Sequence, residues 1–184
     1  EFHTYQTTAP SECVAHIADA NIVLTNKVVI NAETMDACTN LQLICVTATG
    51  TNNVDLAYAS QKGIAVKNVA GYSTASVAQT TIMLALNLIG HAAYYDDFVK
   101  KGGWVSAPTF THIERSFWEI KGKRWGIIGL GTIGKEVAKI ATAFGAEVVY
   151  YSTSGANNDA LYKRVSLEEM LQTCSIITIH APLN

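Results

Sequence analysis

Three glycines, Gly129, Gly131 and Gly134, stand at a spacing that suits the binding of a phosphate-containing ligand. They follow the strand-like run Trp125–Ile128 and open the helix-like run Lys135–Phe144. In such a turn the first glycine permits a sharp bend, the second lets a pyrophosphate approach the backbone, and the third lets helix and strand pack closely. Unpaired N–H groups at the start of the helix attract the phosphates. Glycines also occur in turns without a ligand, but this setting predicts a dinucleotide site at Gly129, Gly131, Thr132, Ile133 and Gly134.

Ser152 occupies the position that would contact the adenosine ribose. Seventeen residues separate it from Gly134, the last of these glycines. An Asp or Glu there would bond the ribose 2′-hydroxyl and repel a 2′-phosphate. Ser152 does neither strongly, and the hydroxyls of Ser152, Thr153 and Ser154 are all able to donate to a phosphate. No Arg lies in this stretch, and the nearest basic residues, Lys163 and Arg164, follow a polar loop. The expected cofactor is therefore NAD or NADP, with no clear preference.

The composition is that of a globular protein with no electrostatic footprint for nucleic acid. The 184 residues carry a formal net charge of −2, and 49% of them are hydrophobic against 15% charged. Such a chain can bury a large core, and its scattered Lys and Arg residues favour neither nucleic acid nor an anionic membrane. The four cysteines form no CxxC pair or Cys/His cluster, so we expect no metal site. No secretory pattern or membrane-length apolar run occurs, so we expect a soluble, cytoplasmic protein.

Short β-branched runs alternate with helix-like runs along the whole chain, which predicts parallel sheets covered by helices, an α/β fold. The strand-like runs are Ile22–Thr25, Leu43–Thr47, Ala65–Asn68, Arg124–Ile128, Glu147–Tyr151 and Ser175–His180. The helix-like runs are Pro10–Ala18, Glu33–Cys38, Asp55–Gln61, Ser73–Lys101, Thr132–Phe144 and Ser166–Gln172. We expect Ser73–Lys101 to be one long helix that is buried between layers over Ile82–Ile89. The alternation breaks at Trp104–Lys123, which we interpret as a connector and partner-contact region, so the chain should divide into two α/β units near residue 100.

Three longer blocks together resemble the D-isomer-specific 2-hydroxyacid dehydrogenase family, and its glycerate dehydrogenase/hydroxypyruvate reductase branch in particular. The blocks are VTATGTNNVDLAYASQKGIAVKNVAGYSTASVAQ, WGIIGLGTIGKEVAKIATAFGAEVVYY and CSIITIHAPLN. The resemblance implies a Rossmann-type, doubly wound parallel sheet plus part of a flavodoxin-like substrate domain. Residues 1–100 would be a partial substrate domain that ends in the long helix, and residues 101–184 a partial NAD(P)-binding domain. We expect the chain to be an internal portion of a longer dehydrogenase.

The resemblance also implies roles for residues that the pattern alone leaves as ordinary loop or helix positions. Thr49 and Gly50, at a strand end, would offer backbone N–H groups to the substrate carboxylate, and Tyr72 would lie near the substrate on a second loop. Thr81 would face the cofactor. Three residues would line the nucleotide pocket on the nicotinamide side, mainly through their backbone: His180, Ala181 and Pro182. From the residues alone, His180 is better explained as a hydrogen-bonded structural histidine than as an acid–base catalyst.

The implied activity is hydride transfer between NAD(P)H and a small 2-oxo or 2-hydroxy acid, such as glyoxylate or hydroxypyruvate. The family's substrate-binding Arg and its His–Glu proton donor lie beyond the HAPL block, so no catalytic residue is assigned here, and the 184-residue chain alone should be inactive. The resemblance also implies a homodimer through the nucleotide-binding domain. Two alternatives remain: an NAD(H)-sensing binding protein or corepressor of the same fold, and a fold fragment without activity.

Overall fold

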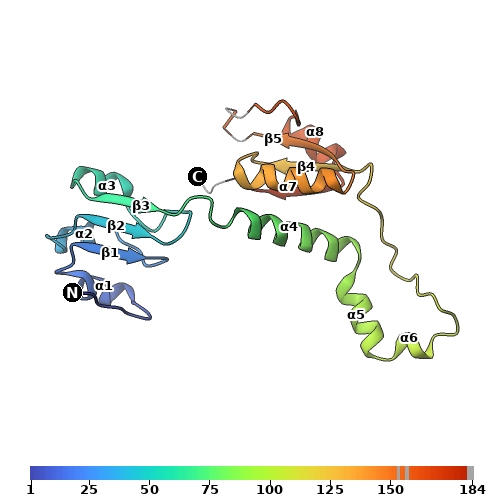
Figure 1. Cartoon of the computed structure of the whole chain (residues 1–184), viewed down its shortest axis with the longest axis horizontal. Coiled ribbons are helices and arrows are strands. Elements are labelled where there is room, and N and C mark those ends of the chain that lie inside the picture. Colours follow the sequence, from blue (N-terminus) through green and yellow to red (C-terminus); the bar gives the residue numbers. More distant parts are fainter. Residues whose placement is uncertain (153, 156–157, 182–184) are drawn as a thin grey trace. The chain divides into compact units, whose positions relative to one another are not determined.

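The chain forms two compact units, Glu1–Tyr72 and Ser73–Asn184, and each contains its own parallel sheet (Figure 1). The computed structural model describes residues 1–152, 154–155 and 158–181. The predicted α/β fold with parallel sheets is confirmed. No helix among these residues is both long and apolar enough to cross a membrane.

The first unit is a three-stranded sheet with short helices. Its elements are η1 (Pro10–Glu12), α1 (Cys13–Ile17), β1 (Ile22–Thr25), α2 (Ala32–Ala37), β2 (Leu43–Val46), α3 (Leu56–Gln61) and β3 (Ala65–Asn68). The strands pair in the order β1-β2-β3. Asn31 and Asp55 cap α2 and α3, because their side chains accept hydrogen bonds of 2.9 Å from the first-turn N–H groups of Thr34 and Tyr58. The three strands pair in parallel, so their carboxyl ends lie at one edge of the sheet.

The second unit contains a four-stranded sheet in which the strand order reverses beside the glycine turn. Its strands are β4 (Arg124–Ile128), β5 (Glu147–Tyr151), β6 (Lys163–Arg164) and β7 (Ile176–Ile179), in the order β6-β5-β4-β7. The chain therefore moves outward from β4 to β6 and then returns to place β7 on the other side of β4. Ligands of open α/β sheets bind at such a reversal, outside the carboxyl ends of the strands.

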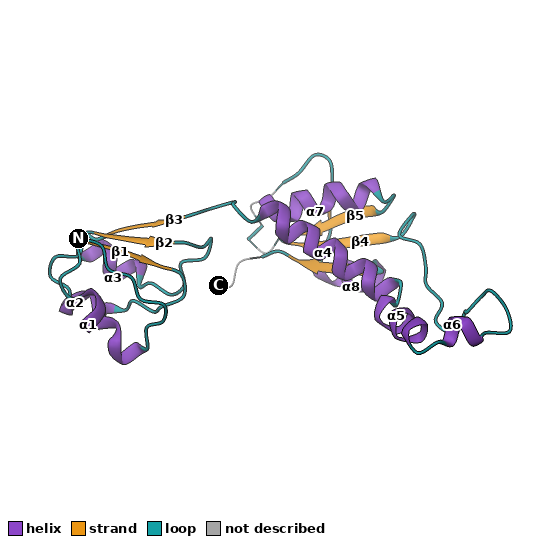
Figure 2. Cartoon of the chain, turned by 60° about the horizontal axis from the view of Figure 1, so that its bottom comes forward, coloured by secondary structure: helices purple, strands orange, loops and turns teal. Residues whose placement is uncertain are grey.

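Helices cover both faces of this second sheet. The helix α7 (Thr132–Ala143) lies on one face, since a Cβ on its Gly134 would be 3.2 Å from Cγ2 of Ile127. The helix α8 (Leu167–Thr173) covers the other face, since a Cβ on Gly126 would be 2.7 Å from Cγ of Met170. The long helix α4 (Thr74–Ile89) packs beside α7 (Figure 2). This is the layering that the alternation of strand-like and helix-like runs predicted and that the family resemblance implied.

The prediction of one helix over Ser73–Lys101 is wrong. The helix α4 ends at Ile89, and His91 adopts a left-handed conformation with φ of 49° before α5 (Ala92–Lys100) begins. A further short helix, α6 (Gly103–Ser106), follows. His91 Nε2 lies 3.2 Å from the carbonyl oxygen of Ser116, a long-range contact that accompanies the break. Residues with positive φ are uncommon outside glycine, so the break depends on tertiary context that no local pattern shows.

The prediction that Ile82–Ile89 is buried throughout is also wrong. Only Ala78, Ile82 and Ala85 of α4 are buried, and they form the stripe that joins the core with α7. The apolar side chains on the rest of the helix are exposed, with Leu88 at 77%. In the part of the chain that the structure describes, α7 is the helix against which α4 packs along its length.

The boundary between the compact units lies after Tyr72 rather than near residue 100. The reason is the packing of α4, whose buried stripe belongs to the core of the second sheet. The assignment of residues 1–100 and 101–184 to substrate and nucleotide functions stays a prediction.

Candidate functional site

The three residues that directly follow the central strands of the second sheet lie at the same edge. β4 pairs with β5 and with β7 so that Ile128 stands opposite both Tyr151 and Ile179. The next residues along the three strands are therefore Gly129, Ser152 and His180. Two backbone hydrogen bonds fix this edge: Gly129 N–H donates to Tyr151 O at 2.9 Å, and His180 N–H donates to Ile128 O at 2.7 Å. The sequence-predicted cofactor residues of β4, β5 and β7 thus meet at the point where the strand order reverses.

Each glycine of the turn meets a different steric demand. Gly129 has φ of 90°, and a Cβ there would lie 2.8 Å from both the carbonyl oxygen of His180 and the backbone nitrogen of Ala181. A Cβ on Gly134 would overlap the carbonyl oxygen of Gly129. Gly131 differs, since no described atom lies within 4 Å of the Cβ position and its φ of −82° suits any residue. Gly129 and Gly134 are required for folding, whereas the open side of Gly131 is where a ligand can approach the backbone.

The first turn of α7 presents unpaired N–H groups beside that open space. Gly131 is the N-cap and offers no side-chain acceptor to the N–H groups of the residues that follow it, Thr132 and Ile133 among them. The four first N–H groups of a helix have no partner within it, and the helix dipole adds partial positive charge at this end. With twelve residues, α7 is long enough to produce such a dipole. The arrangement can bind the two phosphates of a dinucleotide.

Three buried polar side-chain atoms without hydrogen-bond partners lie at the ends of strands in the described chain. Among the described residues, Thr25 Oγ1, Ser152 Oγ and His180 Nε2 are the buried side-chain atoms that have no hydrogen-bond partner. Thr25 ends β1, Ser152 follows β5 and His180 follows β7. Ser152 is only 3% exposed. Leaving a buried polar group unpaired costs about 1–3 kcal/mol, so such groups are typical of places that a ligand or water completes.

His180 is therefore not the hydrogen-bonded structural histidine that the sequence favoured, as far as the described residues show. Burial lowers the pKa of its imidazole, because desolvation penalises the charged ring. The ring is neutral at neutral pH and adds no positive charge to the pocket. Ala181 is half-buried with its backbone against Gly129, in agreement with a backbone role, and Pro182 lies outside the described residues.

In the first unit, the loop after β2 is fastened to the end of β3. Asn68 Nδ2 donates to the carbonyl oxygen of Thr49 at 2.6 Å, and Thr49 Oγ1 donates to the carbonyl oxygen of Val69 at 3.3 Å. Within the described chain, the backbone N–H groups of Thr49 and Gly50 have no acceptor. Two adjacent donors at a strand end can bind a carboxylate, which fits the predicted role of these residues.

Two other predicted residues are not brought to these loops by any contact among the described residues. Tyr72 ends the first unit on a turn and is 64% exposed. Thr81 lies half-buried on α4, where its hydroxyl donates to the carbonyl oxygen of Val77 at 2.9 Å. Their proposed contacts to substrate and cofactor stay predictions.

A basic residue that the sequence placed beyond a polar loop reaches Gly155, three residues after Ser152. Arg164 Nη1 donates to the carbonyl oxygen of Gly155 at 3.0 Å. The strand β6, on which Arg164 lies, has only two residues and was not predicted. The signal for it was weak: a basic pair before an apolar residue in YKRV. No group of three His, Cys, Asp or Glu side chains in the described ranges is arranged to hold a metal ion.

Comparison with known proteins assigns the chain to a family. The sequence model for the "D-isomer specific 2-hydroxyacid dehydrogenase, NAD binding domain" matches residues 82–184. A hydroxypyruvate reductase of Blautia hydrogenotrophica is 38% identical over 174 residues, which cover 94% of this chain and 54% of that protein. A glycerate dehydrogenase of Methylorubrum extorquens is 35% identical over 184 residues, 100% of this chain and 57% of that protein.

A solved structure agrees with these sequence matches. The D-lactate dehydrogenase of Aquifex aeolicus, complexed with NAD and lactic acid, superposes with a TM-score of 0.80 at 28% identity, covering 93% of this chain and 51% of that one. The chain thus spans about half the length of the relatives that it matches. It belongs to the D-isomer-specific 2-hydroxyacid dehydrogenase family.

Proposed function

We propose that the full-length protein is an NAD(P)-dependent oxidoreductase that interconverts a small 2-oxo acid, such as glyoxylate or hydroxypyruvate, and its 2-hydroxy acid. The observation that carries this proposal is the meeting of Gly129, Ser152 and His180 at the strand-order reversal, beside the open space at Gly131. The names of the relatives support the class of substrate, since they include a hydroxypyruvate reductase and a glycerate dehydrogenase.

In this proposal each part of the site has one role. The first turn of α7 binds the pyrophosphate, and Ser152 contacts the adenosine ribose. The nicotinamide supplies or accepts the hydride when the cofactor is bound. The peptide groups of His180 and Ala181 line its pocket, and Thr81 faces the cofactor from α4. The N–H groups of Thr49 and Gly50 bind the substrate carboxylate, with Tyr72 on the neighbouring loop.

We further propose that the 184-residue chain alone turns over no substrate. Three further histidines have described side-chain contacts to other protein groups. His16 stacks on Tyr5 with ring centroids 3.7 Å apart, and His112 stacks on Phe98 at the same distance. His91 contacts the Ser116 carbonyl oxygen. His180 lies at the end of β7, and desolvation lowers the pKa of its ring, so the neutral ring carries no extra proton to give to a substrate carbonyl at neutral pH.

The test of the function is loss of the reduced-nicotinamide absorbance when full-length protein is mixed with NADH or NADPH and a 2-oxo acid. Glyoxylate, hydroxypyruvate and pyruvate should be compared, and at least one should be reduced with saturation kinetics. A protein that binds NADH but reduces none of a broad 2-oxo acid panel would instead support the NAD(H)-sensing alternative. Measurable turnover by the 184-residue chain alone would contradict its proposed inactivity.

The cofactor preference of the full-length enzyme should be weak, and Ser152→Asp should make it strong. Ser152 presents no carboxylate to a 2′-phosphate, so NADPH is not repelled. We expect both cofactors to be used, with kcat/KM values that differ by about ten- to thirty-fold, or ~1–2 kcal/mol. An Asp would bond the 2′-hydroxyl and repel the phosphate, so the variant should prefer NADH sharply.

Ser152→Ala is the matched control, because it removes the hydroxyl without adding charge and should leave both cofactors usable. The comparison needs kcat/KM for NADH and NADPH in all three proteins. If the unmodified enzyme already rejects NADPH by several orders of magnitude, Ser152 is not the residue that reads the ribose.

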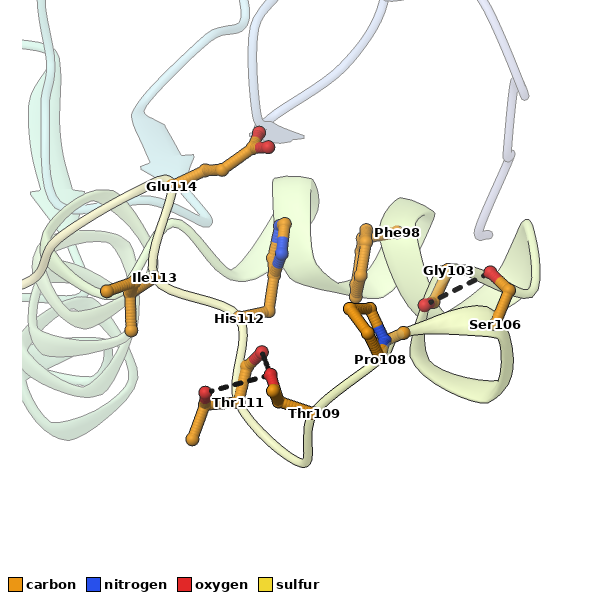
Figure 3. A pocket seen from close by; sticks show the side chains of 10 residues that line it. Phe98, Gly103, Ser106, Pro108, Thr109, Thr111, His112, Ile113 and Glu114 are labelled. Carbon is orange, nitrogen blue, oxygen red and sulfur yellow. Dashed lines mark hydrogen bonds between the residues drawn. The ribbon is translucent and has the colours of Figure 1, made fainter.

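We also propose a homodimer through the second unit. The segment from α4 to the start of β4 exposes many large apolar side chains, whereas monomeric proteins rarely expose large contiguous apolar patches. The exposed apolar residues of this segment are Met83, Leu84, Leu86, Leu88, Val99, Trp104, Val105, Phe110, Ile113, Phe117 and Trp118. A pocket of about 620 Å³ opens along this segment, with the His112 ring stacked against Phe98 (Figure 3). A second copy of the chain is the occupant that the resemblance implies.

The dimer should dissociate when charges are placed on its most exposed apolar residues. Val105 and Phe110 are 90% and 88% exposed, so the double variant Val105→Glu/Phe110→Glu should fold normally while losing the apolar contact. Light scattering should give the mass of a dimer for the unmodified full-length protein and of a monomer for the variant. Leu161→Glu, at an 85% exposed position outside this segment, should remain dimeric. An unmodified protein that is monomeric at micromolar concentration would refute the proposal.

A further inference from the structure

Two described residues after β5, Gly155 and Asp159, each contact a basic side chain. Arg164 Nη1 of β6 donates to the carbonyl oxygen of Gly155 at 3.0 Å. Lys135 Nζ of α7 lies 3.1 Å from Asp159 Oδ2. The Leu161 backbone N–H, followed by the Lys135 ammonium, lowers the pKa of the Asp159 carboxyl, so this carboxylate is charged at neutral pH. Arg164 is an exposed residue, and its hydrogen bond to Gly155 O holds the guanidinium beside this loop.

Strand pairing brings Arg164 to the ribose end of the site. In the parallel pair of β5 and β6, Arg164 stands opposite Tyr150. Tyr150 precedes Ser152 by two residues. From there its side chain reaches Gly155, whose N–H in turn contacts the carbonyl oxygen of Ser152 at 3.4 Å. A Cβ on Gly155 would lie 3.6 Å from Arg164 Nη2. The guanidinium therefore lies beside the short turn that begins at Ser152.

The charge of Arg164 is not neutralised by a carboxylate within the described ranges. The neighbouring cations, in contrast, have carboxylate partners. Lys135 pairs with Asp159, and Lys163 pairs with Glu169 at 3.8 Å. The described bond of Arg164 uses one N–H on a carbonyl oxygen, and a guanidinium has five. Several charged donors thus remain for an anionic ligand.

A second, independent observation points to a ligand at the same turn. Ser152 Oγ is buried without a hydrogen-bond partner, and Ser152 is 3% exposed. A phosphate monoester that carries about two negative charges would accept from both the hydroxyl and the guanidinium. A bare ribose hydroxyl would use Ser152 alone.

We infer that Arg164 is the residue that binds the 2′-phosphate of NADP(H) and so determines how well this protein accepts the phosphorylated cofactor. The inference rests on the proposed function, because it requires the dinucleotide to lie with its adenosine ribose at Ser152. The sequence alone predicted no clear cofactor preference, because no Arg lies in the stretch that begins at Ser152. Arg164 arrives through the pairing of β6 with β5, not through the loop that directly follows Ser152.

The experiment measures binding by the full-length protein without turnover. Titrations of NADPH and NADH, followed by nicotinamide fluorescence, give both dissociation constants. Arg164→Gln should raise the constant for NADPH about ten- to a hundred-fold. It should change the constant for NADH less than about twofold. Arg164→Lys, which keeps the charge but not the planar fork, should lie between the two.

A matched control and a salt series separate the electrostatic role from a structural one. Lys163→Gln, at the neighbouring position on the same strand, should leave both constants unchanged. The NADPH constant should rise more steeply with salt than the NADH constant, and this difference should vanish in Arg164→Gln. Adenosine 2′-phosphate should compete with NADPH less well after the substitution.

The outcomes distinguish this inference from the proposed function. Unmodified protein that binds neither cofactor would contradict the proposed function itself. Unmodified protein that binds both, with an Arg164→Gln variant whose NADPH constant is unchanged, would overturn the inference alone. Equal weakening of NADH and NADPH in that variant would also overturn it, since Arg164 would then only support the loop.

Discussion

Gly131→Val should abolish dinucleotide binding while leaving the protein folded. The Cβ position of Gly131 has no described atom within 4 Å, and its φ of −82° is open to any residue, so the valine meets no obstacle in the protein. Its methyl groups would fill the space through which a pyrophosphate approaches the first turn of α7. We expect the dissociation constants for NADH and NADPH to rise at least ~100-fold, or ~2.7 kcal/mol. The loss of a permissive N-cap residue should reduce stability by only about 1 kcal/mol.

The matched control is Ala143→Val, which adds a branched side chain at the exposed, opposite end of the same helix. Calorimetric titration of both cofactors and thermal unfolding should be measured for the two variants. The control should bind normally, and both variants should unfold within a few degrees of the unmodified protein. If folded Gly131→Val protein bound the cofactors normally, the pyrophosphate would not bind at this turn. That result would contradict the central element of the proposed function.

Trp125→Ala should cause the largest loss of stability of any single truncation in the second sheet. Trp125 is fully buried in β4, at 0% exposure, within the core that α7 and α4 cover. Its indole Nε1 donates to Thr178 Oγ1 of β7 at 3.1 Å, so the side chain also joins the strands on either side of the reversal. Replacing a buried Trp by Ala costs about 3–5 kcal/mol, which corresponds to a fall in Tm on the order of 10–20 °C.

Trp125→Phe separates the two contributions, because it keeps most of the ring volume and removes the hydrogen-bond donor. We expect it to lose about 1–2 kcal/mol, since Thr178 Oγ1 then lacks its partner. Leu161→Ala, at an exposed position of the same unit, should be nearly neutral. Chemical denaturation followed by circular dichroism measures all three variants. A Trp125→Ala protein as stable as Leu161→Ala would contradict the described packing of β4.

The strands were the most predictable part of the fold. The runs Ile22–Thr25, Ala65–Asn68, Arg124–Ile128 and Glu147–Tyr151 match β1, β3, β4 and β5 in both bounds. Buried parallel strands consist of short β-branched runs between turn residues, so their limits are written locally. The two-residue β6 lacks such a run and exists because Val165 N–H and its neighbours pair with β5. Its prediction required knowledge of the partner strand.

The helix after Ser73 shows where local pattern fails. Apolar residues continue past Ile89, so periodicity alone extends the helix to Lys101. The break at Gly90 and His91 depends on a left-handed residue and on a contact with Ser116, far along the chain. Burial is equally hard to predict from local pattern. An apolar helix face indicates that another surface covers it, but the sequence does not show whether that surface belongs to the same chain or to another one.

The positions of site residues could be predicted where regular helices and strands determine the spacing between them. They could not be predicted where an irregular loop lies between them. The interval from Gly134 to Ser152 is set by one helix and one strand, whose lengths follow from their rise per residue. Ser152 was therefore placed correctly at the end of β5. Arg164 lies across an irregular loop, and its approach to Gly155 depends on how that loop closes. The roles of Tyr72 and Thr81 stay predictions for the same reason, since each depends on how separate segments meet.

The distribution of the core over the two units has a consequence for how the protein can evolve. Each of the three buried clusters in the described chain lies within one unit, one in Glu1–Tyr72 and two in Ser73–Asn184. Substitutions at distant sites without shared partners act nearly additively. A substitution at a buried residue of the first unit would thus leave the core beneath Ser152 and Arg164 undisturbed. The two units can therefore accumulate core substitutions separately, in either order, and neither set need compensate for the other.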